Sequence, residues 1–457
     1  MKRIQDMTSG NPAKLIFFFA LPLMLGNVFQ QMYTMVDTII VGQIVGVEAL
    51  AALGVCEWII WLIQGVSSGF AQGFSILISQ RFGAEDGAGL RKSVSMSAVL
   101  ACIIGVSMTI ISFLTIRPIL RILNTPENIM AQASLYLHIL LGGLIIYTAY
   151  NTMAAVLRAM GDGRTPLYAM IAASVVNISL DLLFVVGFRW GVAGAAAATV
   201  IAQFSSCLCC IAALRRIPQL QMDAEDWKPE PRTMIKLLSL GFPICFQNII
   251  ISIGGLVVQT VVNGFGMIFV AGFTATNKLY GILEVAATSF GFSMATYTGQ
   301  NLGAGKYQRI KQGGKSAVIM AIGTALVISG AMVLFGRKIL MLFISAEPDV
   351  AAQVLDVAFT YLMFMSSMLF VLYLLYVYRS GLQGMGDTII PLVSGIAELV
   401  MRISAAVLLP KRIGQGGIYF AEILAWLAAE LLLMGFFYYR LHNLLKKDAG
   451  TSGHKPG

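Results

Sequence analysis

Long apolar blocks separated by short polar connections extend along nearly the whole chain. Blocks such as Leu15–Met24 and Val318–Phe335 contain no charged residue. Their apolar residues are consecutive, whereas the strands of a membrane barrel alternate between apolar and polar positions. Since about 20 apolar residues carry a helix across a bilayer, the pattern predicts an all-α integral membrane protein. Its twelve expected spans are 14–44, 49–80, 93–116, 131–158, 165–187, 191–214, 233–263, 267–300, 314–336, 352–383, 388–410 and 417–442.

Composition narrows the possible functions. Of the 457 residues, 58% are hydrophobic and 12% are charged, against roughly 25% charged residues in soluble domains. The spans leave no room for a large soluble domain, and the sequence has no GxxxxGK[ST] phosphate-binding loop. We therefore exclude a pump with its own ATPase and expect an ion gradient to supply the energy.

The net charge of +9 follows the membrane topology. Most of the 31 Lys and Arg residues fall in alternate connections or at the span ends beside them, Arg379 at such an end. This positive-inside distribution predicts a multi-pass protein of a bacterial cytoplasmic membrane with both termini in the cytoplasm, and it argues against nucleic acid as a partner. Cysteine acts as a small hydrophobe within apolar spans, so we expect no disulfide bond, structural metal or cofactor. The six cysteines in such spans are Cys56, Cys102, Cys207, Cys209, Cys210 and Cys245.

The chain repeats itself at a spacing of about 220–225 residues. Leu21-Pro22 corresponds to Phe242-Pro243, and Met160-Gly161-Asp162 corresponds to Met385-Gly386-Asp387. Each half holds six expected helices, so the two repeats have the same orientation. The expected division is an N-terminal lobe of residues 1–214, a linker of 215–232, a C-terminal lobe of 233–442 and a tail of 443–457. Pro22 removes a helical hydrogen bond and is a hinge candidate.

Two aspartates of the first half lie at membrane depth. Ionisable side chains cost at least about 2.5–3.5 kcal/mol there, so Asp37 and Asp181 are functional candidates. Asp181 ends a stripe at spacings of four, three and four that places Met170, Ser174, Asn177 and Asp181 on one helix face. Further oxygen donors on other helices of this half are Gln30, Tyr33, Tyr136, Tyr147, Asn151 and Thr199.

Two carboxylates among amide and hydroxyl oxygens suit ion exchange. In apolar surroundings such a pair takes up a proton near neutral pH, and the same oxygens suit Na⁺ or the ammonium group of an organic substrate. We favour H⁺ because the surroundings of Asp37 are apolar. The alternative interpretation is that Asn177 and Asp181 only bridge helices, as buried polar groups do in helix bundles.

The second half carries charges of a different kind. Glu398 and Arg402 are four residues apart and are expected to pair on one helix. The sequence leaves two interpretations open, a structural network or a second cation or substrate site. The deep charges concerned are Lys278, Glu284, Glu398, Arg402, Glu422 and Glu430.

Together these motifs resemble the multidrug and toxic compound extrusion (MATE) family, and the resemblance covers essentially the whole chain. It is carried by two six-helix repeats, by Pro22 and Asp37, by the turn Arg158–Pro166 and by Asn177-x-x-x-Asp181. The family implies a V-shaped pair of lobes that exports organic cations and amphipathic compounds in exchange for H⁺ or Na⁺. It also implies a cation-coupling site at Asp37, Asn177, Asp181 and Thr199. The implied substrate-binding residues are Gln30, Tyr33, Asn151, Met170 and Ser174.

Two rival functions stay open. A flippase for a lipid-linked sugar would share the scaffold, although its cargo favours a cationic cavity and the deep charges of the first half are acidic. An intramembrane enzyme is a weaker rival because no HExxH motif or paired GxGD aspartates occur. We expect a monomeric, non-enzymatic transporter whose partners are small molecules and the lipid bilayer.

Overall fold

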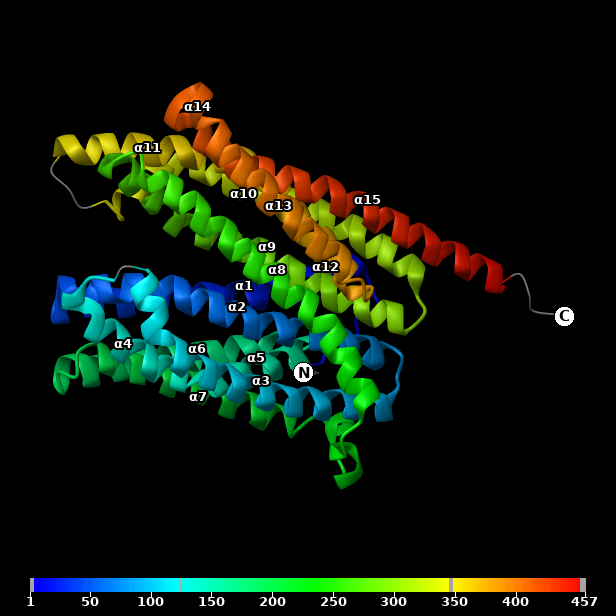
Figure 1. Ribbon diagram of the computed structural model, residues 1–457. Helices are drawn as coiled ribbons and strands as arrows, with labels where there is room; N and C mark the ends of the chain where they lie inside the picture. The colour runs from blue at the N-terminus through cyan, green and yellow to red at the C-terminus, as the bar shows by residue number, and fades with distance from the viewer. Residues whose placement is uncertain (1–3, 124, 345–347, 453–457) are drawn as a thin grey trace. The chain divides into compact units, whose positions relative to one another are not determined.

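The computed structural model describes residues 4–123, 125–344 and 348–452, which are mostly helical (Figure 1). In the first half, two helices are followed at once by short π-helical segments, and two 3₁₀ segments lie in the connection after the last long helix. The elements there are α1 (Pro12–Ile40), η1 (Val41–Val45), α2 (Val47–Gly83), α3 (Gly87–Ile122), α4 (Glu127–Gly142), α5 (Leu144–Ala159), α6 (Arg164–Asp181), η2 (Leu182–Gly187), α7 (Val192–Leu214), η3 (Pro218–Leu220) and η4 (Ala224–Trp227).

The second half repeats this succession of long helices. Its elements are α8 (Pro231–Asn263), α9 (Met267–Gly303), α10 (Tyr307–Met341), α11 (Pro348–Ser367), α12 (Leu369–Gly384), α13 (Ile389–Leu408), α14 (Pro410–Ile413), η5 (Gly414–Ile418) and α15 (Tyr419–Ser452).

All twelve predicted spans fall on helices. Among the described residues, nine helical stretches are long and apolar enough to cross a membrane, and the pair α4 and α5 makes a tenth. One stretch, Ile389–Lys447, runs through two predicted spans. Helix α9 coincides with the predicted span 267–300 but is not one of these stretches. The span expected at 352–383 is divided between α11 and α12. The span expected at 131–158 is not one straight helix, because α4 and α5 meet at Gly143 with a bend of 45°. The protein is thus an all-α, multi-pass membrane protein.

The chain folds into two compact units. Unit 1 comprises Leu21–Cys245 with the segment that ends at Asp6, and unit 2 comprises Met7–Ala20 with everything from Phe246 onward. This differs from the division expected at residues 214 and 233, because α1 begins in unit 2 and α8 begins in unit 1. Each of these two helices therefore passes from one unit to the other partway along its length.

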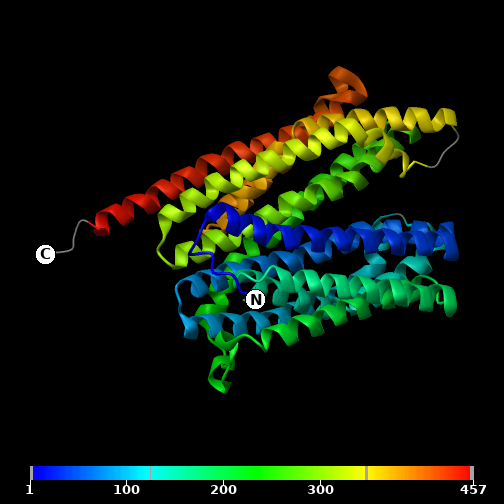
Figure 2. The same ribbon diagram turned by 180° about the vertical axis from the view of Figure 1, so that it is seen from behind.

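The connection between the halves belongs to unit 1 because it is held by α3. Arg91 pairs with Asp226 at 3.0 Å, and Lys92 donates to the backbone carbonyls of Glu225 and Lys228. The same connection lies at the end of α3 in the view from behind (Figure 2). The η3 and η4 segments of this connection are thus held against α3.

The repeated turns before α6 and α13 use glycine and aspartate in the same way. Gly161 and Gly386 have φ angles of 88° and 83°, which favour glycine. Asp162 accepts hydrogen bonds from the backbone of Arg164 and Thr165 and from the Thr165 hydroxyl. Asp387 accepts one from the backbone of Ile390 at 3.2 Å. Both aspartates therefore stabilise the start of the following helix.

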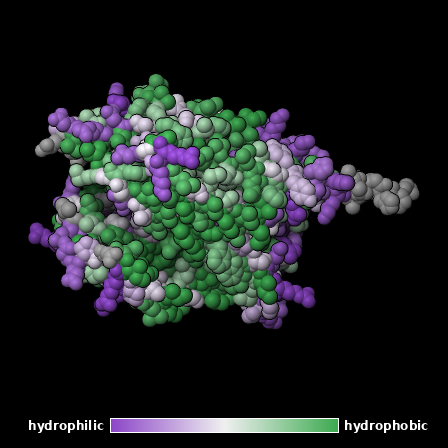
Figure 3. All heavy atoms as spheres, turned by 45° about the horizontal axis from the view of Figure 1, so that its top comes forward, coloured by the Kyte–Doolittle hydropathy of each residue, from purple (hydrophilic) through white to green (hydrophobic). Residues whose placement is uncertain are grey.

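Apolar and polar side chains separate on the surface. Figure 3 shows apolar side chains over the middle of the face it presents and hydrophilic side chains towards its two ends. Some large apolar side chains are highly exposed, such as Leu114 at 73% and Leu334 at 74%. Such side chains suit contact with lipid.

Candidate functional site

Three polar side chains are buried inside unit 1. Asp37 on α1 is 7% exposed, while Asn177 and Asp181 on α6 are both 0% exposed. Asn177 and Asp181 are one helical turn apart and therefore share a face of α6. The charges of Asp37 and Asp181 repel each other, so the two carboxylates lie within electrostatic reach across α1 and α6.

These side chains have polar atoms without a protein partner. Within the described chain, five of their polar atoms have no hydrogen bond. These are both carboxylate oxygens of Asp181, both amide atoms of Asn177 and Oδ1 of Asp37. Buried polar groups are nearly always hydrogen-bonded, and an unmatched one calls for an explanation. Helix bridging does not explain them, because a bridging side chain holds its partner.

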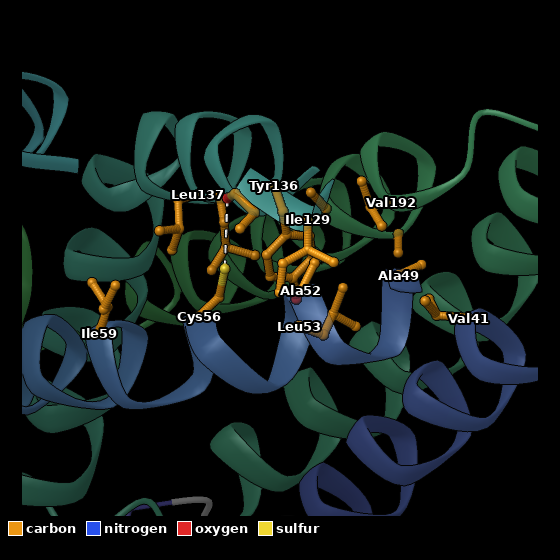
Figure 4. Close-up of a cluster of buried hydrophobic side chains, with 14 of the residues drawn as sticks. Val41, Ala49, Ala52, Leu53, Cys56, Ile59, Ile129, Tyr136, Leu137 and Val192 are labelled. Carbon is orange, nitrogen blue, oxygen red and sulfur yellow. Dashed lines mark hydrogen bonds between the residues drawn. The ribbon is translucent and has the colours of Figure 1, made fainter. Parts of the chain in front are cut away.

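Tyrosines and apolar residues surround the carboxylates. Tyr136 on α4 interacts electrostatically with Asp37 and Asp181, and Tyr33 interacts with Asp37 from one helical turn away. Tyr136 belongs to a buried apolar cluster from α2, α4 and neighbouring elements (Figure 4). Cys56 of this cluster donates a hydrogen bond to the Ala133 carbonyl at 3.5 Å. These neighbours keep the carboxylates in surroundings of low polarity.

The sequence spacing explains why α6 presents its polar atoms inward. Its buried residues include Met170, Ser174, Asn177 and Asp181, which confirms that the predicted stripe is one buried face. Directly after Asp181 the helix widens into the π-helical η2, and α1 widens into η1 just after Asp37. The two π-helical segments contact each other. Such segments are frequent at functional sites.

The other predicted site residues lie in different surroundings. Thr199 on α7 is half-buried and donates to the Ala195 carbonyl at 3.1 Å. Asn151 is half-buried and donates to the Tyr147 carbonyl of α5. Gln30 is exposed on the surface of unit 1. The predicted span 131–158 put Tyr136, Tyr147 and Asn151 on one helix. In the structure Tyr136 lies on α4, whereas Tyr147 and Asn151 lie on α5.

Ser174 and Met170 are only 6% and 7% exposed, and the Ser174 hydroxyl donates to the Met170 carbonyl. Their side chains are part of the packed face of α6. The six cysteines are free thiols, and the described residues hold no group of three or more His, Cys, Asp or Glu side chains arranged for a metal ion.

Comparison with known proteins identifies the family. The MatE family model matches the chain twice, over residues 22–183 and 243–408. This chain belongs to the MATE family of transporters. The two matches also agree with the repeat predicted from the sequence, since each covers one half.

Similar proteins include two relatives from one bacterium and a solved structure that shares the fold. The chain is 30% identical to the probable multidrug resistance protein YpnP of Bacillus subtilis (strain 168), over 76% of this chain and 78% of that protein. It is also 30% identical to the probable multidrug resistance protein YoeA of the same strain, over 72% and 73% of the two chains. Its fold matches a MOP superfamily transporter from Pyrococcus furiosus with a TM-score of 0.92 and 24% identity, covering 97% of this chain and 99% of the other.

The two repeats of this MATE protein differ at the position of the first carboxylate. Gln259 on α8 corresponds to Asp37, and its amide donates to Asn263 at 2.9 Å. The repeat partner of Asn177 is Arg402, which forms ion pairs. Among the described residues, the unpartnered carboxylate and amide atoms at these positions lie in unit 1, whereas in unit 2 Arg402 is ion-paired and only its Nε atom lacks a partner.

Unit 2 of this MATE transporter contains a chain of buried ion pairs instead. Arg402 pairs with Glu398 at 2.7 Å, as the sequence predicted, and with Glu422 at 2.8 Å. Arg379 pairs with the other oxygen of Glu398 at 2.8 Å. The charge pattern predicted Arg379 to be a cytoplasmic cation near the end of the span 352–383, but it is only 7% exposed on α12. The apolar run that precedes Arg379 could have indicated its burial, because the helix formed by that run continues through Arg379.

Proposed function

We propose that this protein is a secondary active antiporter that exports organic cations and other amphipathic compounds in exchange for H⁺ or Na⁺. The observation that supports this most strongly is the set of unpartnered atoms of Asp37, Asn177 and Asp181 in the interior of unit 1. A site of this kind binds a cation and releases it again. The names of the relatives, which refer to multidrug resistance, support a small-molecule substrate.

Competition for the two carboxylates supplies the coupling. With the site open to the outside, Asp37 and Asp181 take up the ion, which reduces their negative charge and weakens their attraction for a cationic substrate. With the site open to the cytoplasm, where both termini are placed by the positive-inside pattern, they release the ion and attract the substrate. No covalent chemistry is required, because each half of the cycle only exchanges the occupant of the same oxygens.

We favour H⁺ as the coupling ion. Tyr33, Tyr136 and a buried apolar cluster surround the carboxylates, and low polarity favours the neutral, protonated form of an acid. A bound Na⁺ would need several oxygens at once. Asn177 and Thr199 are the neutral side chains proposed to contribute them.

The test is transport by purified protein in proteoliposomes with a fluorescent organic cation. Asp37→Asn keeps the volume of the side chain and removes its charge. We therefore expect ion-driven transport to fall at least about tenfold, which corresponds to about 1.4 kcal/mol. Glu127→Gln, which changes an exposed carboxylate in the first turn of α4, is the matched control and should keep the wild-type rate. Wild-type transport by Asp37→Asn would contradict the proposal.

A further inference from the structure

The buried charges of unit 2 do not balance. Arg379 and Arg402 are the two cations of the ion-pair chain, and Glu398 and Glu422 supply the carboxylates that pair with them. One carboxylate per arginine is therefore already in place. Glu430 on α15 is an additional buried acid with no cation of its own.

Glu430 has no partner although it is deeply buried. It is 5% exposed, and neither of its carboxylate oxygens has a hydrogen bond within the described part of the chain. Its carboxylate interacts electrostatically with Arg379, whose Nε atom likewise lacks a partner. Glu430 and Arg379 thus face a common region where α12 and α15 pack along each other, yet they do not form a contact.

The other groups around Glu430 offer it no hydrogen bond. From α12, Tyr378 interacts with it electrostatically, but the Tyr378 hydroxyl is shared with Tyr438 of α15 at 3.2 Å. From α13, Glu398 and Arg402 are engaged with each other. The buried faces of α10 and α11, which also contact α15, contribute no charged side chain among the described residues.

We infer that Glu430 is a second proton-binding site of this transporter, located in unit 2 and separate from Asp37 and Asp181. A single carboxylate lacks the several oxygen ligands that a metal cation needs, so the exchangeable ligand is a proton. Proton uptake converts Glu430 into a neutral carboxylic acid, so that Glu398 is then the carboxylate that pairs with Arg379. Proton release restores a negative charge that attracts the free Nε side of Arg379. The site thereby links protonation to the position of the ion-pair chain.

Glu284 provides an internal comparison. It is half-buried on α9 and accepts a hydrogen bond from the Tyr376 hydroxyl at 2.6 Å. An acid with a hydroxyl donor is stabilised by that donor when ionised. Glu430 has no such donor, which distinguishes it from Glu284 among the acids of unit 2.

Infrared difference spectroscopy of the purified protein between acidic and alkaline pH tests this inference. Protonated carboxyl groups absorb separately from carboxylates, so we expect Glu430→Gln to lose one carboxyl band that Asp37→Asn and Asp181→Asn retain. Asp356→Asn, which removes an exposed carboxylate paired with Arg337, should leave the band unchanged. A full wild-type band in Glu430→Gln would overturn the inference.

A second variant covers the case in which Glu430→Gln does not fold. Glu430→Asp keeps the acid and shortens it, so the same band should shift in frequency and in the pH at which it disappears. An unshifted band would overturn the inference as well. The experiment needs no substrate or gradient, so the result stands even if transport proves to be driven by Na⁺ or the proposed antiport fails.

Discussion

At the scale of single residues, Asn177 and Thr199 distinguish the two coupling ions. A proton needs only the carboxylates, whereas Na⁺ needs several oxygen ligands at once. The double variant Asn177→Ala with Thr199→Ala should therefore retain part of its pH-driven transport, within about tenfold of the wild type, a difference of about 1.4 kcal/mol. The measurement is transport in proteoliposomes under a pH gradient without Na⁺.

The same proteoliposomes provide the contrary result. If wild-type protein exports substrate under an inward Na⁺ gradient at clamped pH, but not under an inward proton gradient without Na⁺, the choice of H⁺ is wrong. In that case the double variant should also lose its stimulation by Na⁺. Ser179→Ala changes an exposed hydroxyl of α6 that donates to the Val175 carbonyl, so it serves as the control.

The buried face of α6 was predictable because spacing alone places Met170, Ser174, Asn177 and Asp181 on one side of a helix. The pairing of Glu398 with Arg402 was predictable for the same reason. Arg379 was not, because a single sequence shows neither which helix packs against α12 nor that Glu398 lies there to pair with it. The unpartnered state of Glu430 likewise depends on contacts between distant segments.

At the scale of elements, Pro22 lies where α1 passes from one unit to the other. Unit 2 includes α1 as far as Ala20, and unit 1 includes it from Leu21. Pro22 removes a backbone hydrogen bond next to this point. Pro22→Ala should lower the turnover of transport several-fold, which corresponds to a barrier higher by about 1 kcal/mol. The equilibrium affinity for substrate should change less.

Pro118 offers the matched control because it stands inside α3, a helix that belongs wholly to unit 1. Pro118→Ala should change neither turnover nor affinity appreciably. Measured on purified protein, an equal loss of turnover and affinity in Pro22→Ala would assign Pro22 to the binding surface rather than to a hinge.

The existence of the helices was predictable from apolar length, but their interruptions were not. The bend of 45° between α4 and α5 at Gly143 and the π-helical segments after Asp37 and Asp181 leave no sign in hydropathy. A Cβ atom on Gly143 would lie 2.7 Å from the side chain of Val200. This close approach of the junction between α4 and α5 to α7 is a tertiary contact, which hydropathy does not report.

At the scale of the whole molecule, the sequence repeat agrees with the two family matches. The boundaries of the two compact units lie within α1 and α8, not at the predicted division of the chain. The two family matches begin at residues 22 and 243, close to where α1 and α8 change units. Composition could not indicate this, because α1 and α8 each run on past the point where the unit changes. What the two halves have in common is their fold, whereas the unpartnered aspartates belong to unit 1 and the ion-pair chain belongs to unit 2.

The central claim is that substrate and ion compete for Asp37 and Asp181, and proton release on substrate binding tests it most directly. Purified protein in weakly buffered solution is mixed with a lipophilic organic cation, and a pH-indicating dye reports the protons set free. We predict that the wild type releases protons in proportion to the substrate bound, and that Asp37→Asn and Asp181→Asn release fewer at equal occupancy. Substrate binding without proton release by the wild type, at any pH where it transports, would contradict the account.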